Sequence, residues 1–457
     1  MAAQSPNADS RQFAASTSVP WSAHVTLWLA AAVVGLVTSV GVWLFTQGFG
    51  LINSLTLGTA GALPAPAAQI ATALTLMVGG FLVALFMHYL SRPATLAAMP
   101  HVIDGVAEGS GRLHARNGVV YVLGSLVGIG FGAPVGADTP AAMIGGHFGS
   151  WLAQRLRWRA DFVRALVVAG AGAGIAATFS AQLAAVFFAL EVVLGGFGGA
   201  VFVIPTLLAV VASTLFTFWI DGAPTPYQVP AGAGVWGINL VLYSGVAVLA
   251  ALAAIAYVNL LAHLRGLWVK VTLPFWAKAA LAGLMVGIVG IWLPDIFGTG
   301  LSQMKAIFSG TVFPLQMLVA LALAKLLLTP NSLGAGFVGG VIGPALLIGS
   351  WLGAAYGAVV VQMVPSLGVS PVAFAMVATA AMLAATFHAP LFGAMMVFEM
   401  VDDIRFLVPL ALGAALAYGI ALRFQPGSAY TFGFPALGMR FVPGTFTAEH
   451  TDDQSNR

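Results

Sequence analysis

A single carboxylate lies within a long apolar stretch of the chain. Between Arg116 and Arg155 the only acidic residue is Asp138, the only histidine is His147, and lysine and arginine are absent. A charge at membrane depth is costly and persists mainly where it lines a cavity or an ion path. Gly136 loosens the backbone and Pro140 suits a first helical turn, which predicts that Asp138 lies at a helix N-terminus, where an anion is held. The alternative is a plain helix cap in a water-filled vestibule, since aspartate is a favoured cap.

Other residues that could do chemistry are isolated. The histidines His101, His147 and His388 show neither metal-ligand spacing nor an HExxH pattern, so no metal site is expected. His147 lies two to three helical turns beyond Asp138 and could accept a proton, although a packing role is preferred. Residues 232–237 match a dinucleotide fingerprint in letters, but no strand precedes them and we interpret them as a loop. We therefore expect no cofactor and no enzymatic activity.

The composition predicts a polytopic α-helical membrane protein. Of 457 residues, 60% are hydrophobic and only 7% are charged, whereas soluble domains carry roughly 25% charged residues. The chain has no basic polar face for nucleic acid, and zero cysteines exclude disulfides and thiolate metal sites. The arginine-rich residues 155–164 are expected on the cytoplasmic side. The apolar run at 25–45 is too long for a cleaved signal and predicts the first membrane helix, after a polar tail at 1–24.

The membrane segments change character along the chain. A loop is expected at 58–66, followed by a second long apolar run at 70–90. Later apolar segments are short and broken by glycine, at 119–133, 140–153, 162–176, 179–194, 200–219 and again from 334 to 423. Interrupted helices are tolerated in membranes only where they are buried in protein or line a cavity. Residues 222–237 are rich in proline and glycine and suggest a linker between two halves, with long runs resuming at 239–261, 279–293 and 315–329.

The two halves share sequence. Residues 175–183 (IAATFSAQL) align with residues 383–391 (LAATFHAPL) at a shift of 387 − 179 = 208, which also pairs Glu191 with Glu399. Upstream, residues 140–145 (PAAMIG) align with 344–349 (PALLIG) at a shift of 344 − 140 = 204. Two blocks in the same order indicate a duplication, a common plan among transporters with sites at the repeat interface. Asp138 maps to 138 + 204 = 342, an isoleucine, so the carboxylate belongs to one repeat only.

These blocks resemble the CLC family of chloride channels and chloride/proton antiporters. The family pattern Gly-Arg-Glu-Gly-Pro corresponds to residues 136–140, and Gly-x-Phe-x-Pro corresponds to residues 340–344. Its Gly-Ser-Gly-Ile-Pro pattern falls on residues 96–100, and Ser428-Ala429-Tyr430-Thr431 resembles the segment with the central tyrosine. The resemblance spans about 25 to 440 and keeps the order of the motifs.

The resemblance implies a homodimer in a bacterial inner membrane, in contact with lipid, whose subunits each have two inverted repeats of tilted, broken helices around their own pore. The transmembrane domain is expected at 25–424, with repeat halves at roughly 68–220 and 275–423, followed by a C-terminal segment at 425–457. The resemblance also implies that Asp138 is the gate. The anion would be held at Ala97, Ala98, Val341, Ile342, Gly343 and Tyr430, between pore loops that contain Gly136, Ala137, Thr139, Pro140, Gly340 and Pro344.

The chain departs from the family pattern at four places. Asp138 is one methylene shorter than the family's gating glutamate, the neighbouring arginine is Ala137, the central serine is Ala97, and the proton-relay glutamate falls on Val192. The loss of the serine hydroxyl leaves backbone N–H groups and the Tyr430 hydroxyl as donors. Glu191, beside Val192, and Glu399 are expected to be structural acids bonded to backbone N–H groups or to a neighbouring loop.

These departures favour passive chloride permeation, in which protonation or outward movement of Asp138 opens the path and acid activates conductance. Chloride/proton antiport is the alternative, because a carboxylate is retained and Glu191 could replace the relay. A non-conducting membrane scaffold or sensor is the third hypothesis. The physiological anion is left open, with chloride implied by the resemblance.

Overall fold

The computed structural model describes residues 20–90, 99–107, 110–227 and 237–431. The described part is almost entirely helical, and eight of its helices are long and apolar enough to cross a membrane. Ala97, Ala98, most of the N-terminal tail and the chain after Thr431 lie outside the described residues.

The first part of the chain forms α2 (Trp21–Asn53), a π-helical turn (Ser54–Gly58) and α3 (Thr59–Gly61), which together form one continuous helical span. The expected tail boundary at residue 24 was wrong, because the helix begins at Trp21 directly after Pro20. The expected loop at 58–66 begins later, because Gly58 alone does not end the helix and the first prolines follow at Pro64 and Pro66.

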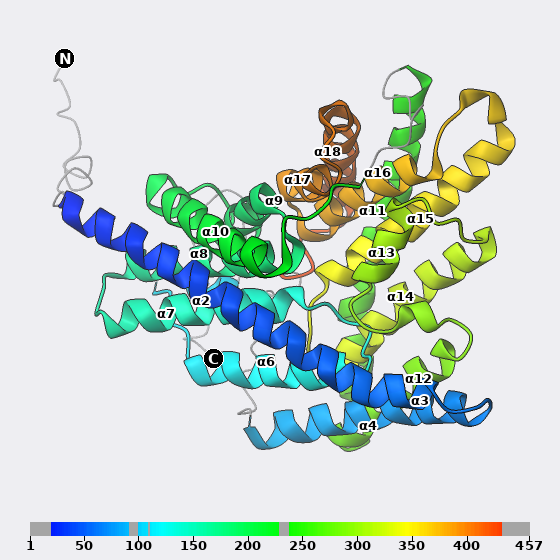
Figure 1. The fold of residues 1–457 in the computed structure, drawn as a ribbon, viewed down its shortest axis with the longest axis horizontal. Helices are drawn as coiled ribbons and strands as arrows, with labels where there is room; N and C mark the ends of the chain where they lie inside the picture. The colour runs from blue at the N-terminus through cyan, green and yellow to red at the C-terminus, as the bar shows by residue number, and fades with distance from the viewer. Residues whose placement is uncertain (1–19, 91–98, 108–109, 228–236, 432–457) are drawn as a thin grey trace, which may run out of the picture.

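Two series of helices then follow one another in the same order (Figure 1). The first series is α4 (Ala67–Leu90), α5 (Met99–Ala107), α6 (Ala115–Gly130), α7 (Asp138–Arg155), α8 (Ala160–Phe179), α9 (Gln182–Phe187) with the π-helix η2 (Phe188–Leu194), and α10 (Ala200–Asp221). After the connecting helix α11 (Ile238–Lys270), the second series is α12 (Phe275–Gly290), α13 (Leu301–Phe308), α14 (Leu315–Ala335), α15 (Ile342–Met363), α16 (Pro371–Phe387), α17 (Pro390–Val401) and α18 (Leu407–Phe424). Short 3₁₀ turns (Pro294–Ile296, Pro365–Leu367 and Ile404–Phe406) join some of them.

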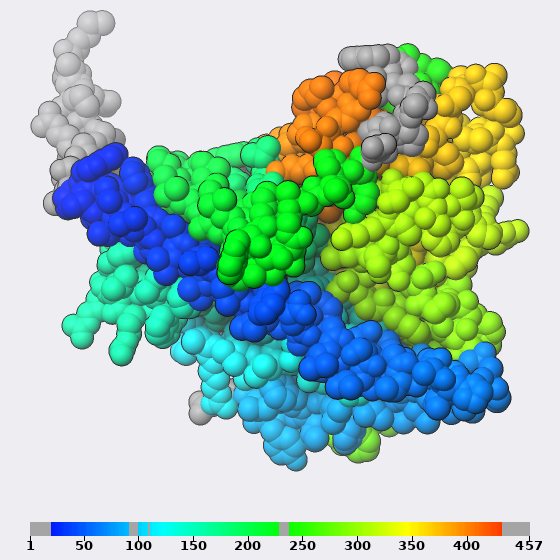
Figure 2. Space-filling view, viewed as in Figure 1, coloured from blue at the N-terminus to red at the C-terminus, as the bar shows by residue number. Residues whose placement is uncertain are grey.

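The core consists of α7 and α8 in one series and α15 and α16 in the other. Glycines bring each pair together: a Cβ on Gly145 would meet the carbonyl of Gly170, and one on Gly349 would meet the backbone of Thr379. Small residues allow such close approach in membranes, where packing rather than hydrophobic burial drives helix association. The outer helices carry exposed apolar side chains. Figure 2 shows α2 running across the visible face, and its side chains Leu29, Leu36, Leu44 and Leu51 are exposed.

The two series are inverted repeats, and their contacts are reciprocal. Gly136 and Gly340 form an isolated antiparallel bridge in which each N–H donates to the other's carbonyl, at 2.8 and 2.7 Å. The two glycines are related by 340 − 136 = 204, the shift found in the sequence. The residues that end α8 and α16, Ser180 and His388, both adopt left-handed conformations with φ of 53° and 55°. The internal repeat predicted from sequence is therefore a pseudo-twofold arrangement, and the bridge lies on its axis.

Candidate functional site

The site lies where α7 and α15 begin, beside the Gly136–Gly340 bridge. Both loops are short, and the bridge fixes them against each other before each chain turns into its helix. Glycine at both bridge positions leaves room for Asp138, because a Cβ on either residue would meet its side chain. Close packing of the two loops therefore directs both helix N-termini toward one small volume.

The carboxylate of Asp138 occupies that volume. Asp138 is the first residue of α7 and is fully buried. Its two oxygens accept hydrogen bonds from the backbone N–H groups of Ile342, at 3.2 Å, and Gly343, at 3.1 Å, at the start of α15. These donors are unpaired within α15 because they belong to its first turn, and they carry the positive end of its dipole. The carboxyl group of one repeat thus accepts hydrogen bonds from the helix N-terminus of the other.

Two hydroxyl groups complete the surroundings of Asp138. Thr139 Oγ1 lies 3.3 Å from Asp138 Oδ2, and the Tyr430 hydroxyl lies 3.5 Å from the same oxygen. The two hydroxyls are 3.1 Å apart. Tyr430 is buried, and its ring packs against Phe387 with centroids 5.1 Å apart. Tyr430 therefore reaches Asp138 from a segment 292 residues away in sequence.

The other expected site residues surround this volume in different ways. Val341 is the N-cap of α15 and its carbonyl accepts from the Ala345 N–H, so it belongs to the helix start. Ala137 is the buried N-cap of α7. Pro140 and Pro344 occupy the third helical position of α7 and α15, where the missing N–H costs nothing. His147 packs along α7, with Nδ1 3.0 Å from the carbonyl of Met143.

Sequence reasoning missed two residues that hold the loops around the starts of α7 and α15. The buried Tyr121 hydroxyl donates to the carbonyl of Gly339 at 2.8 Å and accepts from its N–H at 3.1 Å. The ammonium of Lys325 is fully buried and donates to the carbonyls of Ile296 and Gly298, both at 2.8 Å. Gly298 in turn donates to the carbonyl of Gly132, just before the Asp138 loop. Lys325 could have been found from sequence, because it is a lone charge in the apolar run at 315–329.

Glu191 and Glu399 form a matched pair of helix caps. Glu399 accepts from the N–H groups of Leu183 and Ala184 in the first turn of α9, at 2.7 and 2.8 Å. Glu191 accepts from Leu391 and Phe392 in the first turn of α17, at 3.3 and 2.8 Å. The shift of 208 converts one set of contacts into the other, since 183 + 208 = 391 and 184 + 208 = 392. Both acids bind backbone N–H groups of the opposite repeat.

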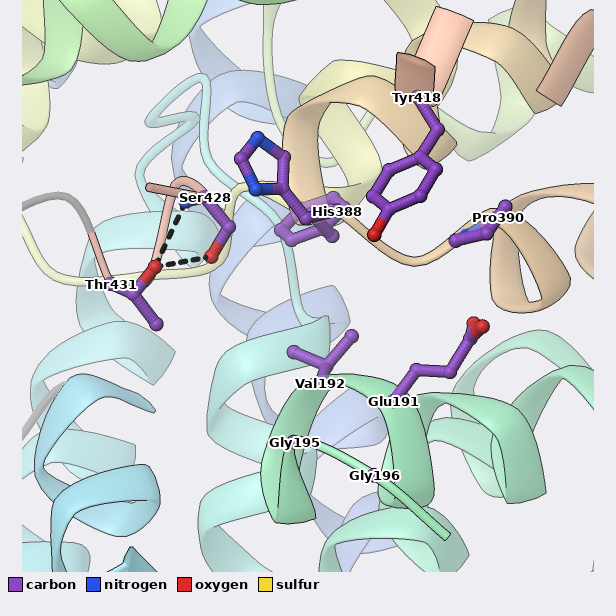
Figure 3. Close-up of a pocket in the computed structure, with 10 residues that line it drawn as sticks. Glu191, Val192, Gly195, Gly196, His388, Pro390, Tyr418, Ser428 and Thr431 are labelled. Carbon is purple, nitrogen blue, oxygen red and sulfur yellow. Dashed lines mark hydrogen bonds between the residues drawn. The ribbon is translucent and has the colours of Figure 1, made fainter. Parts of the chain in front are cut away.

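A pocket of about 190 Å³ lies beside this site (Figure 3). Glu191, Val192, Gly195 and Gly196 form one side of it, and His388, Tyr418, Ser428 and Thr431 lie on the opposite side. Ser428 and Thr431 belong to the same short segment as Tyr430, whose N–H donates to Ser428 Oγ at 3.3 Å. One segment thus lines the pocket and also contacts Asp138. We call this cavity the Val192 pocket.

The comparisons with known proteins agree with this architecture. Residues 79–422 match the family model described as voltage-gated chloride channel. The chain belongs to the voltage-gated chloride channel (CLC) family. The chain is 31% identical over 344 residues to a Ralstonia nicotianae protein named as a ClcB-like chloride channel protein, covering 74% of this chain and 80% of the relative. It is 27% identical over 401 residues to the H(+)/Cl(-) exchange transporter ClcA of Yersinia pseudotuberculosis, covering 84% and 83%.

Solved CLC structures have the same fold. A slow cyanobacterial Cl-/H+ antiporter superposes with a TM-score of 0.80 at 24% identity, covering 89% of this chain and 96% of the other. A CLC-type fluoride/proton antiporter gives a TM-score of 0.76 at 19% identity, covering 91% and 99%. The expected fold class is confirmed. Together with bacterial relatives, the apolar spans make this CLC protein an integral protein of the bacterial inner membrane.

Proposed function

We propose that this CLC protein exchanges chloride for protons, with Asp138 as the group that both gates the anion path and carries the proton. The observation that carries the proposal is the position of the Asp138 carboxylate, which is bound by the Ile342 and Gly343 N–H groups as an anion would be. Backbone donors at a helix N-terminus attract a dehydrated anion without the trapping strength of a full cation. Chloride and the carboxylate therefore compete for one set of donors.

Protonation of Asp138 would end that competition. A neutral carboxylic acid loses most of its attraction to the two N–H groups, so it can move away and an anion can take its place. That anion departs when the acid loses its proton and the carboxylate returns. Movement of chloride then accompanies binding and release of a proton. The departures at Ala97, Ala137 and Val192 favour passive conduction. The relative from Yersinia is named an exchange transporter, and on that ground we prefer exchange.

Passive chloride conduction is the second candidate. Val192, at the position of the family's proton-relay glutamate, forms an apolar part of the pocket wall, and so provides no proton site there. In this candidate Asp138 is a gate but not a carrier. The family's central serine corresponds to Ala97. Ala97 and Ala98 lie outside the described residues, and we propose both residues as anion contacts on the resemblance alone. A homodimer is likewise proposed from the family.

The test uses the purified full chain in chloride-loaded liposomes, with external chloride and pH recorded together. Proton movement in a fixed ratio to chloride, persisting against a proton gradient, supports exchange, whereas chloride flux without protons supports passive conduction. Asp138→Asn removes the titration but keeps the shape. We expect it to retain chloride flux while losing both proton coupling and acid activation. Asp161→Asn, at an exposed ion pair with Arg159, is the control. An unchanged pH response in Asp138→Asn would contradict the proposal, and halide binding without flux would indicate a non-conducting scaffold.

A further inference from the structure

The Val192 pocket contains one imidazole whose nitrogens have no hydrogen-bond partner. Among the described residues neither ring nitrogen of His388 makes a hydrogen bond, and Nε2 is also shielded from solvent. The ring is half-buried on the pocket side opposite Val192 and Glu191 (Figure 3). A buried polar atom without a partner needs an explanation such as an unseen water or a functional role. His388 lines the pocket, so water in the pocket can supply a partner for the ring.

The other polar groups of the pocket either have hydrogen-bond partners already or do not titrate near neutral pH. Both oxygens of Glu191 accept backbone N–H groups of α17, so protonation of this carboxylate would weaken a helix cap. Tyr418, on α18, packs its ring 6.1 Å from that of His388, and its phenol keeps its proton near neutral pH. Ser428 and Thr431 satisfy each other, with their hydroxyls 3.1 Å apart. Helix α17 contributes Pro390, and α11 and α15 contribute no described titratable side chain to the pocket.

The left-handed backbone at His388 does not by itself indicate function. Ser180, its equivalent in the other repeat at 180 + 208 = 388, has nearly the same φ, so this conformation belongs to the duplicated scaffold. The imidazole is present in one repeat only. Asp138 is one-sided in the same manner, with Ile342 as its equivalent. An imidazole can bind a second proton on its free ring nitrogen, whereas the serine hydroxyl at the equivalent position cannot.

We propose that His388 is the proton-binding group of the Val192 pocket: its neutral imidazole takes a proton from pocket water and returns it during each transport cycle. This inference rests on the proposed exchange function and gives it a second titratable residue. The pocket is connected to Asp138 through the 428–431 segment, whose Tyr430 hydroxyl contacts the carboxylate. His388 thus provides a titratable side chain in the pocket, whereas the side chain of Val192 cannot bind a proton.

The decisive variant is His388→Asn, because asparagine tolerates the left-handed backbone but does not titrate. The matched control is Ser180→Asn, at the equivalent position of the other repeat. In liposomes we expect His388→Asn to lower the ratio of protons to chloride by at least about tenfold, as for loss of a proton-transfer group, with chloride flux largely kept. Ser180→Asn should change neither. His388→Gly, which also suits the left-handed backbone, is the second variant if the asparagine protein does not fold.

A wild-type ratio of protons to chloride in His388→Asn would overturn the inference. If the wild-type protein moves chloride without protons, the exchange proposal fails, and His388 is judged by the pH dependence of chloride flux, with pH varied on each side of the membrane separately. A dependence on one side that His388→Asn loses and Ser180→Asn keeps supports proton binding at His388. Identical pH profiles of the wild type and His388→Asn, including flat ones, overturn it.

Discussion

At the residue scale, two glycines confine the Asp138 carboxylate. A Cβ on Gly340 would meet the carboxylate itself, whereas the φ of Gly340 lies outside the left-handed region and accepts alanine. Gly340→Ala should therefore displace Asp138 from the N–H groups of Ile342 and Gly343. We expect chloride flux that no longer rises on acidification, together with a loss of stability of about 1–3 kcal/mol from overpacking. Flux against pH in liposomes and thermal unfolding in detergent measure the two effects.

The control for this substitution is Gly419→Ala, on α18, where nothing lies within 4 Å of the added Cβ. It should leave flux and unfolding temperature unchanged. A Gly340→Ala protein that is less stable but keeps its full acid activation would show that the carboxylate moves without leaving its donors, and the gate assignment would be wrong.

The same scale shows what sequence could predict about the site. A lone acid in an apolar run pointed to Asp138, and the structure places it at the first position of α7, where it accepts from the N–H of Ile342. Lys325 satisfies the same criterion, but the sequence offers no way to know that its partners are the carbonyls of Ile296 and Gly298. Tyr121 could not be recognised, because a tyrosine in an apolar run is common and its contact with Gly339 joins residues 218 positions apart.

At the element scale, the caps of α9 and α17 hold the two repeats together. Each carboxylate satisfies two N–H groups that a helix start leaves unpaired. Glu399→Ala and Glu191→Ala should each destabilise the protein by about 1–2 kcal/mol, as expected for loss of hydrogen bonds to a charged group that is only partly buried. The readout is the unfolding temperature in detergent.

Asp161→Ala is the matched control, because it removes a carboxylate from an exposed ion pair, which contributes little. Equal unfolding temperatures for Glu399→Ala and Asp161→Ala would contradict the capping role. The sequence anticipated backbone N–H partners for both acids. It could not anticipate that each acid caps a helix of the other repeat, because that exchange depends on the three-dimensional twofold relation.

At the scale of the whole molecule, duplication supplies two equivalent helix starts, but only the start of α7 carries an acid. Asp138 accepts from the N–H of Ile342, its own repeat equivalent, and from that of Gly343, the equivalent of Thr139. The sequence revealed the duplication and the fact that Asp138 has no acidic equivalent in the other repeat. It did not give the helix boundaries at 21, 61 and 275, which depend on proline positions and packing. A carboxylate at residue 342 should therefore accept from the N–H groups of residues 138 and 139, in the arrangement related by the pseudo-twofold axis.

The exchanged pair Asp138→Ile/Ile342→Asp tests this symmetry directly. Because the bridge between Gly136 and Gly340 places both loops equivalently, we expect the exchanged protein to recover the acid activation that Asp138→Ile alone loses. Recovery should be partial, since Thr139 and Tyr430 lie beside position 138 whereas Gly343 occupies the position equivalent to Thr139. Chloride flux against pH for the single and exchanged variants gives the answer. A pH-independent exchanged protein that folds would mean that the two hydroxyls, and not the paired helix N-termini, determine where the gating carboxylate works.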